Sequence, residues 1–170
     1  MATKDEIVTE ARALFRRSFP EINEQQACLY LAACVIKVAE KHGIRLVLQA
    51  GSCFWDQLPD DLADGVSDTC FGYEWEPDSV ATAIHLASGV MPELHVWAGD
   101  PITQEIVDLT TGFFPAQYKA LVGKEWRGKV PPNYLWQPSR EVDAEYRVYY
   151  DATKLASVLF SNYMRQKRLR

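Results

Sequence analysis

The chain has 170 residues, of which 48% are hydrophobic and 24% charged, a composition typical of a globular protein with a sizeable core. Its formal net charge of −5 argues against a general binder of nucleic acids or anionic membranes. No apolar run approaches the roughly 20 residues of a membrane-spanning helix, and none follows the N-terminus as the core of a signal peptide would. We therefore expect one cytoplasmic domain over residues 1–170.

The N-terminal part of the chain predicts two helices. Apolar residues at helical spacing predict the first over residues 4–17. The second is predicted from Asn23, a good N-cap residue, to His42, where Gly43 ends it. Because apolar residues nearly surround its axis, this second helix is expected to be central and buried. Cys28 lies in its first turns.

The remaining chain alternates short extended runs with turns and ends in a further helix. Residues 56–68 are acidic and turn-rich, which predicts a surface loop, and residues 123–138 are irregular and aromatic. Strands are predicted over 44–51, 70–75, 82–87 and 145–150, a hairpin over 93–109, and helices over 116–121 and 152–167. Helices followed by a run of strands are typical of an α+β fold, here with the central helix packed on an antiparallel sheet.

The hairpin places a histidine and an aspartate on neighbouring strands. Its turn is predicted at residues 99–101, which are Gly, Asp and Pro. If the pairing is symmetric about the bond between residues 101 and 102, His95 lies directly opposite Asp108 on the same face. A carboxylate in that position fixes the tautomer and the orientation of an imidazole. The alternative is a polar pair on a solvated sheet face.

The four cysteines form no Cys-x-x-Cys unit, which argues against a structural zinc site. Most free cysteines are small buried hydrophobes, and this is the interpretation we favour for Cys34, Cys53 and Cys70. Cys53 follows a predicted strand end and could instead line a cleft. We expect neither a metal nor an organic cofactor.

A cysteine in a buried helix, followed by a histidine and an aspartate on neighbouring strands, resembles the transglutaminase-like branch of the papain-like fold. The similarity lies in residues 27–32, 41–51, 94–97 and 106–110, and it covers about residues 23–114, with a helix before this core and a strand and helix after it. Within that branch the chain is most similar to bacterial small-domain members, which include leader peptidases of lasso-peptide maturation and effector glutamine deamidases. Secretion as an effector without a cleavable signal peptide is therefore the alternative to a cytoplasmic location.

The resemblance implies cysteine-dependent amide chemistry on a peptide or protein: proteolysis, deamidation or acyl transfer through a thioester. Cys28 would be the nucleophile, His95 the base and Asp108 the orienting residue. Thiolate is the nucleophilic form of cysteine, and a helix N-terminus and an imidazolium both favour it. The Cys28 N–H would supply part of the oxyanion hole. Gln25 and Gln26 lie too close to Cys28 to be assigned the oxyanion role of the papain-type glutamine.

Several alternatives stay open. The chain could be a catalytically inactive protein-binding module on the same scaffold. His85 is a rival base if residues 82–87 pair with the strand of His95. Trp97 shares a face with His95, so we expect it to shield the ion pair or bind substrate. Trp136 is expected to contribute to a substrate groove, and core packing is the alternative for both tryptophans. The other candidates for that groove are Tyr134, Tyr149 and Tyr150.

Overall fold

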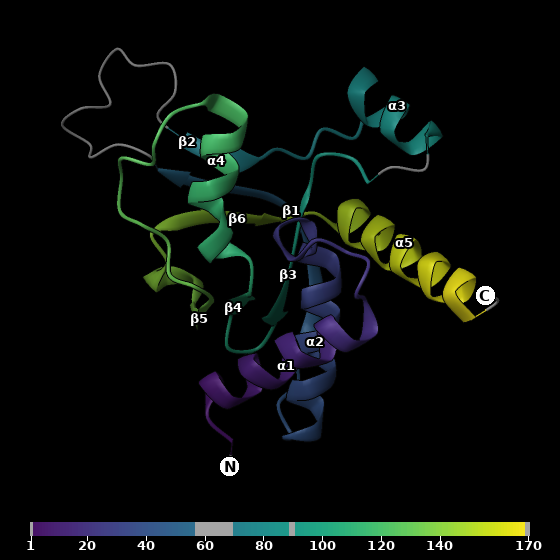
Figure 1. The fold of residues 1–170 in the computed structure, drawn as a ribbon, viewed down its shortest axis with the longest axis vertical. Helices are drawn as coiled ribbons and strands as arrows, with labels where there is room; N and C mark the ends of the chain where they lie inside the picture. Colours follow the sequence, from purple (N-terminus) through teal and green to yellow (C-terminus); the bar gives the residue numbers. More distant parts are fainter. Residues whose placement is uncertain (1, 57–69, 89–90, 169–170) are drawn as a thin grey trace.

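The structure, a computed structural model, describes residues 2–56, 70–88 and 91–168. It has an α+β fold in which helices cover both faces of an antiparallel sheet (Figure 1). In chain order the elements are α1 (Lys4–Ser18), η1 (Glu24–Gln26), α2 (Cys28–Lys41), β1 (Val47–Asp56), β2 (Cys70–Tyr73), α3 (Val80–Ala87), β3 (His95–Asp100), β4 (Glu105–Asp108), η3 (Thr111–Phe113), α4 (Phe114–Val122), β5 (Leu135–Pro138), η4 (Ser139–Glu141), β6 (Ala144–Val148) and α5 (Tyr150–Arg168). Within the described ranges no helix is long and apolar enough to cross a membrane.

Strand β1 is the centre of the sheet because three other strands pair with it. At Cys53 it pairs with Tyr73 of β2 and with Tyr146 of β6, so β2 and β6 lie on opposite edges. At Gly51 it pairs with β3 and again with β6, so β3 shares the edge of β2. Strands β2 and β3 therefore lie end to end, which places Tyr73 close to His95, the first residue of β3.

The sheet is also curled. It continues from β3 to β4 and β5, while β6 pairs only with β1. The hydroxyl of Tyr146 on β6 nevertheless donates a hydrogen bond of 2.9 Å to Asp108 on β4. This contact spans the inside of the curl, so side chains from strands that do not pair can meet there.

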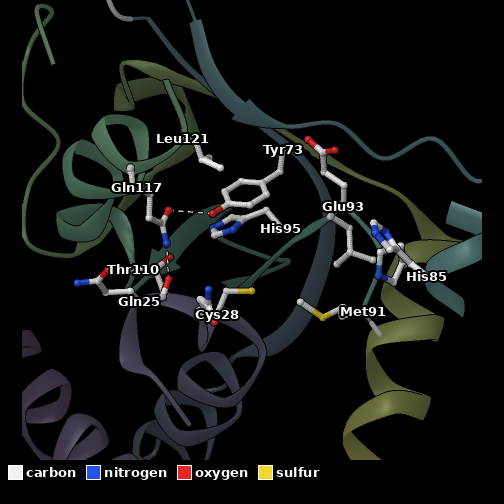
Figure 2. A pocket seen from close by; sticks show the side chains of 14 residues that line it. Gln25, Cys28, Tyr73, His85, Met91, Glu93, His95, Thr110, Gln117 and Leu121 are labelled. Atoms are coloured by element: carbon white, nitrogen blue, oxygen red, sulfur yellow. Dashed lines mark hydrogen bonds between the residues drawn. The ribbon is translucent and has the colours of Figure 1, made fainter. Parts of the chain in front are cut away.

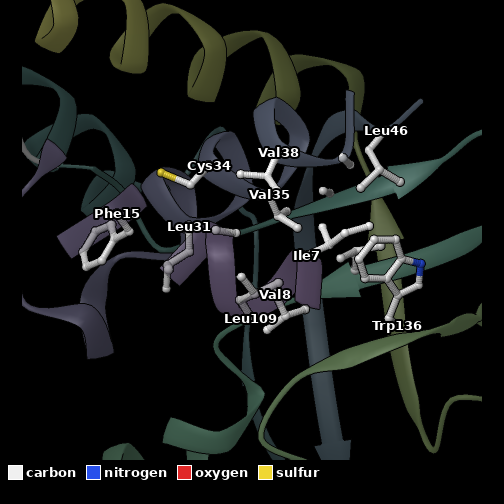
Figure 3. Close-up of a cluster of buried hydrophobic side chains, with 14 of the residues drawn as sticks. Ile7, Val8, Phe15, Leu31, Cys34, Val35, Val38, Leu46, Leu109 and Trp136 are labelled. Atoms are coloured by element: carbon white, nitrogen blue, oxygen red, sulfur yellow. The ribbon is translucent and has the colours of Figure 1, made fainter. Parts of the chain in front are cut away.

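Two hydrophobic layers hold the helices on the sheet. Helix α1 begins at a capping box, in which Thr3 and Glu6 satisfy each other's backbone N–H groups. Helices α1 and α2 pack together on the outer face of the sheet through a buried cluster that includes Phe15, Val35 and Trp136 (Figure 3). Helix α5 joins α2 over the same face, and α4 covers the inner face. The predicted central helix on an antiparallel sheet is confirmed.

Two predicted segments adopt a different secondary structure, and the strand predicted over residues 44–51 is β1 at Val47–Asp56, which includes Cys53. Residues 82–87 are not a strand; they belong to helix α3, which Ser79 caps by accepting a hydrogen bond from the Thr82 N–H at 3.1 Å. Their apolar residues suggested a strand, although only Thr82 of this helix is buried. Residues 135–138, expected to be irregular, form β5. The acidic loop predicted over 56–68 lies, except for Asp56, outside the described residues.

Candidate active site

Cys28 is the first residue of helix α2. Asn23, the predicted start of this helix, instead caps η1 by accepting a hydrogen bond from the Gln25 N–H. A single residue, Ala27, then separates η1 from α2. Cys28 therefore lies at the helix N-terminus itself, where the helix dipole favours an anion. Its side chain is half-buried. Burial raises the pKa of the thiols of the other three cysteines, Cys34, Cys53 and Cys70.

His95 and Asp108 form a buried pair on the inner face of the hairpin. His95 Nε2 lies 2.6 Å from Asp108 Oδ2, and the two side chains are 1% and 2% exposed. The predicted register is wrong by two residues: Asp100 pairs with Glu105 and Ala98 with Val107, which places Asp108 opposite Trp97. Side chains alternate between faces with a period of two, so this shift keeps His95 and Asp108 on the same face as diagonal neighbours.

Asp108 accepts hydrogen bonds on both carboxylate oxygens. Its Oδ1 accepts from the Thr110 N–H at 2.8 Å and from the Thr110 hydroxyl at 2.6 Å. Its Oδ2 accepts from the Tyr146 hydroxyl at 2.9 Å as well as from His95. These donors hold the carboxylate in one orientation, and the carboxylate in turn holds the His95 ring.

The pKa shifts of His95 and Asp108 favour the charged form of both side chains. Burial disfavours an imidazolium, but the charge and hydrogen bond of Asp108 outweigh it, with a further contribution from Cys28, so the pKa of His95 is raised above 6.5. Burial likewise opposes ionisation of Asp108, but His95 and Thr110 lower its pKa below 3.8. Both directions favour a charged imidazolium beside a charged carboxylate at neutral pH.

The second ring nitrogen of His95, Nδ1, is available to Cys28. It is buried, and the Cys28 thiol contributes to the raised pKa of His95 through a side-chain hydrogen bond. Because Asp108 accepts a hydrogen bond from the Nε2–H group of His95, Nδ1 is the nitrogen that can exchange a proton with a thiol. Cys28 contributes to the raised pKa of His95, so the sulfur lies within electrostatic range of the ring. Figure 2 shows the Cys28 and His95 side chains on the same cavity.

Aromatic rings enclose the imidazole of His95. Tyr73 and Trp97 each lie within 20° of parallel to it, at centroid distances of 5.1 and 5.9 Å. Phe114 contacts the ring edge-on at 5.6 Å, and Tyr146 lies 6.2 Å away. Aromatic faces attract a cation and exclude water, so this cage stabilises the imidazolium.

No family model, curated protein or solved structure matches this chain. The assignment of a function therefore depends on the geometry and chemistry of the site. Among the described residues no group of three or more His, Cys, Asp and Glu side chains could hold a metal ion.

A cavity of about 400 Å³ opens beside Cys28 and His95. The residues that line it are Gln25, Gln26, Cys28, Tyr73, His85, Met91, Pro92, Glu93, Leu94, His95, Thr110, Gln117, Ala120 and Leu121. His85 thus lines the same cavity as His95, although it does so from helix α3 and not from a paired strand. Asp108 lies behind His95 and does not reach the wall.

The two tryptophans predicted to bind substrate do not line this cavity. Trp97 is 1% exposed and donates to the Gln49 side chain at 2.8 Å, so it shields the ion pair from inside the sheet. The prediction that Trp136 contributes to a substrate groove is wrong. Strand β5 directs Trp136 to the outer face of the sheet, where it packs with α1 and lies under the ammonium of Lys4. Its position in the sheet depends on the pairing of β5, which the irregular sequence around it did not reveal.

Sequence reasoning missed a polar connection across the cavity. The Tyr73 hydroxyl donates to Gln117 Oε1 at 2.9 Å, and Gln117 Nε2 donates to the backbone carbonyl of Gln25. Tyr73 therefore links its own ring, which stacks on His95, to helix α4 and to the turn that precedes Cys28. No local signal could identify Tyr73 or Gln117, because the contact joins β2, α4 and η1.

We predict that the ring of Tyr73 contributes more to the reactivity of Cys28 than its hydroxyl does. Tyr73→Leu should slow alkylation of Cys28 by iodoacetamide at pH 6 by about 2- to 30-fold, the equivalent of about 0.5–2 kcal/mol for one cation–π contact. Tyr73→Phe keeps the stacked ring and should retain most of the rate. Mass spectrometry of the Cys28 peptide measures both rates. Equal losses in the two variants would assign the effect to the Gln117 hydrogen bond.

Proposed function

We propose that the chain is a cysteine-dependent enzyme that attacks amide carbonyls of a peptide or protein, with a transglutaminase-like, papain-like core. The observation that carries the proposal is the buried pair of His95 and Asp108, 2.6 Å apart, with His95 and Cys28 lining the same cavity. A fully hydrogen-bonded aspartate behind a histidine, with a thiol at a helix N-terminus in front of it, is the arrangement that nucleophilic catalysis requires.

The reaction proceeds in two halves. In the resting site the proton of the Cys28 thiol is held on Nδ1 of the His95 imidazolium, and the Cys28 thiolate attacks the carbonyl carbon to form a tetrahedral oxyanion. The Cys28 N–H at the start of α2 donates to this oxygen. When the intermediate collapses, the C–N bond breaks and His95 gives its proton to the leaving nitrogen. The resulting thioester is then attacked by water or an amine, which His95 deprotonates, and the C–S bond breaks to restore the Cys28 thiolate beside the His95 imidazolium.

Double substitution tests this mechanism. Cys28→Ala and His95→Ala should each abolish nearly all turnover, and the double variant should lose little more than either, because nucleophile and base act as one unit. Asp108→Asn should retain a measurable rate, since the aspartate orients the base and is not consumed. Incubation with a complex peptide mixture and mass spectrometry measures the turnover and separates cleavage, deamidation and transfer to an added amine.

Two outcomes would contradict the proposal. Additive losses in the double variant would show that the two residues do not share a mechanism. A Cys28 thiol that iodoacetamide labels no faster than the exposed Cys70 would favour the protein-binding module.

A further inference from the structure

We propose that the cavity beside Cys28 selects an extended polypeptide segment in which a large apolar side chain neighbours a basic one. This inference rests on the proposed function, because it names the substrate class of the same site. It draws on observations independent of the triad: the apolar walls of the cavity, the exposed apolar side chains of the two helices beside it, and its charge.

The walls of the cavity are mainly apolar. Helix α4 contributes Leu121, and the segment that leads into β3 contributes Met91 and Leu94. Figure 2 shows Leu121 on one side of Tyr73 and Glu93 on the other, with Met91 across the cavity. A bound segment that crosses Tyr73 would therefore have an apolar wall at one end and a carboxylate at the other.

The two helices that contribute to the cavity, α3 and α4, carry exposed apolar side chains. Leu121 is 78% exposed, and Val122 next to it is 42% exposed. On α3, Ile84 and Leu86 flank the cavity residue His85 and are 58% and 42% exposed. Exposed apolar residues on helices that line a concave site favour an apolar ligand there. A polypeptide can cover both helices at once, whereas a small metabolite would occupy only the cavity.

The charge of the site favours a cation. Among the described residues that line the cavity, Glu93 is the carboxylate and none is Lys or Arg, while the His95 imidazolium is paired with Asp108. In the segment that follows the lining residue Tyr73, the side chains of Glu74, Glu76 and Asp78 are exposed. None of these four carboxylates forms an ion pair with another residue in the described part of the chain. A basic side chain is therefore attracted to this rim and an acidic one repelled.

Matched peptide vinyl sulfones test the proposal. The first pair of probes carries leucine and lysine, once in each order. In the second pair glutamate replaces the lysine of each probe, and in the third pair glycine replaces the leucine. The rate at which each labels Cys28 is divided by the iodoacetamide rate of the same variant. The better lysine probe should react about tenfold faster than its glutamate counterpart. Loss of the leucine should slow labelling about fivefold, as expected for partial burial of one apolar side chain.

Single substitutions locate the two contacts. Glu93→Gln should reduce the lysine-to-glutamate ratio about two- to fivefold, the size of one exposed charge interaction. Glu141→Gln, which removes the same charge from the exposed turn η4, should leave the ratio unchanged. Leu121→Ser should reduce the leucine-to-glycine ratio. Both cavity residues are exposed, so these variants should fold.

The outcomes separate this proposal from the proposed function. Equal labelling by all probes, with fast labelling by iodoacetamide, would overturn the selectivity and leave the triad intact. Slow labelling of Cys28 by iodoacetamide would overturn the proposed function, while the ratios among the probes would still report on the cavity. A preference for lysine that Glu93→Gln does not change would also contradict the assignment of Glu93.

Discussion

Replacing His95 with alanine should slow the alkylation of Cys28 at pH 6 by about tenfold or more. A free cysteine with a pKa near 8.5 is only about 0.3% thiolate at this pH, and thiolate is the reactive form. An imidazolium next to the sulfur raises that fraction by up to about 300-fold. Part of this gain is offset because a more stable thiolate is a weaker nucleophile, with a Brønsted coefficient of about 0.4–0.5. The net loss on removing His95 is therefore smaller than the change in thiolate fraction.

His85→Ala is the matched control for this experiment. His85 lines the same cavity from α3, but the carboxylate that orients an imidazole lies behind His95. We expect the His85 variant to alkylate at nearly the wild-type rate when the Cys28 peptide is followed by mass spectrometry. If the His85 variant were the slow one, His85 would be the base and Asp108 would have no catalytic role.

Replacing Asp108 with alanine should destabilise the fold by about 3–5 kcal/mol, the cost of removing one partner from a buried charged pair. Three residues would lose their acceptor: His95, Thr110 and Tyr146. Asp108→Asn should cost less but not nothing, because an amide offers only one accepting oxygen and its NH₂ group must face other donors. Urea unfolding followed by tryptophan fluorescence measures both changes.

The loss of stability in Asp108→Ala depends on pH, because the pKa values of Asp108 and His95 both change on folding. The pKa of Asp108 is lowered on folding, so its contribution is present above its unfolded pKa near 3.8 and is lost as the pH falls through the folded pKa. The pKa of His95 is raised, so its contribution is complete below 6.5 and is lost as the pH rises from there through the folded pKa. The difference in the free energy of unfolding between wild type and Asp108→Ala should be largest between pH 3.8 and pH 6.5.

Asp143→Ala, at an exposed ion pair with Lys129, is the control and should change the free energy of unfolding by less than about 1 kcal/mol. An equally small change in Asp108→Ala would contradict the buried pair.

The pairing of His95 with Asp108 was predictable although the register of the hairpin was not. The turn occupies residues 101–104, not 99–101, and Gln104 adopts the left-handed conformation at φ 58°. Glutamine gives no sequence signal for this conformation, which glycine or asparagine usually supplies. The two-residue error left every side chain on its predicted face. The alternation of faces is thus a more robust prediction than the register.

The remainder of the site depends on contacts between distant segments. Tyr73 reaches His95 because β2 and β3 share an edge of β1, and Tyr146 reaches Asp108 because the sheet curls. Neither arrangement has a signature within a short stretch of sequence. The apolar residues of helix α3 are exposed, so their spacing does not report a buried face and does not distinguish a helix from a strand. Ser79, its N-cap, was the local signal that could have identified it.

The order of the elements also bears on how the site assembles during folding. His95 and Asp108 are 13 positions apart in one hairpin, so closing the loop between them costs little conformational entropy. Cys28 is separated from that hairpin in the sequence by α2, β1, β2 and α3, so bringing it to the His95 ring closes a longer loop at a higher entropic cost. The nucleophile should therefore be the last of the three residues to arrive. In a refolding experiment with short pulses of iodoacetamide, a change in Cys28 labelling should follow hairpin formation and report the completion of the native state.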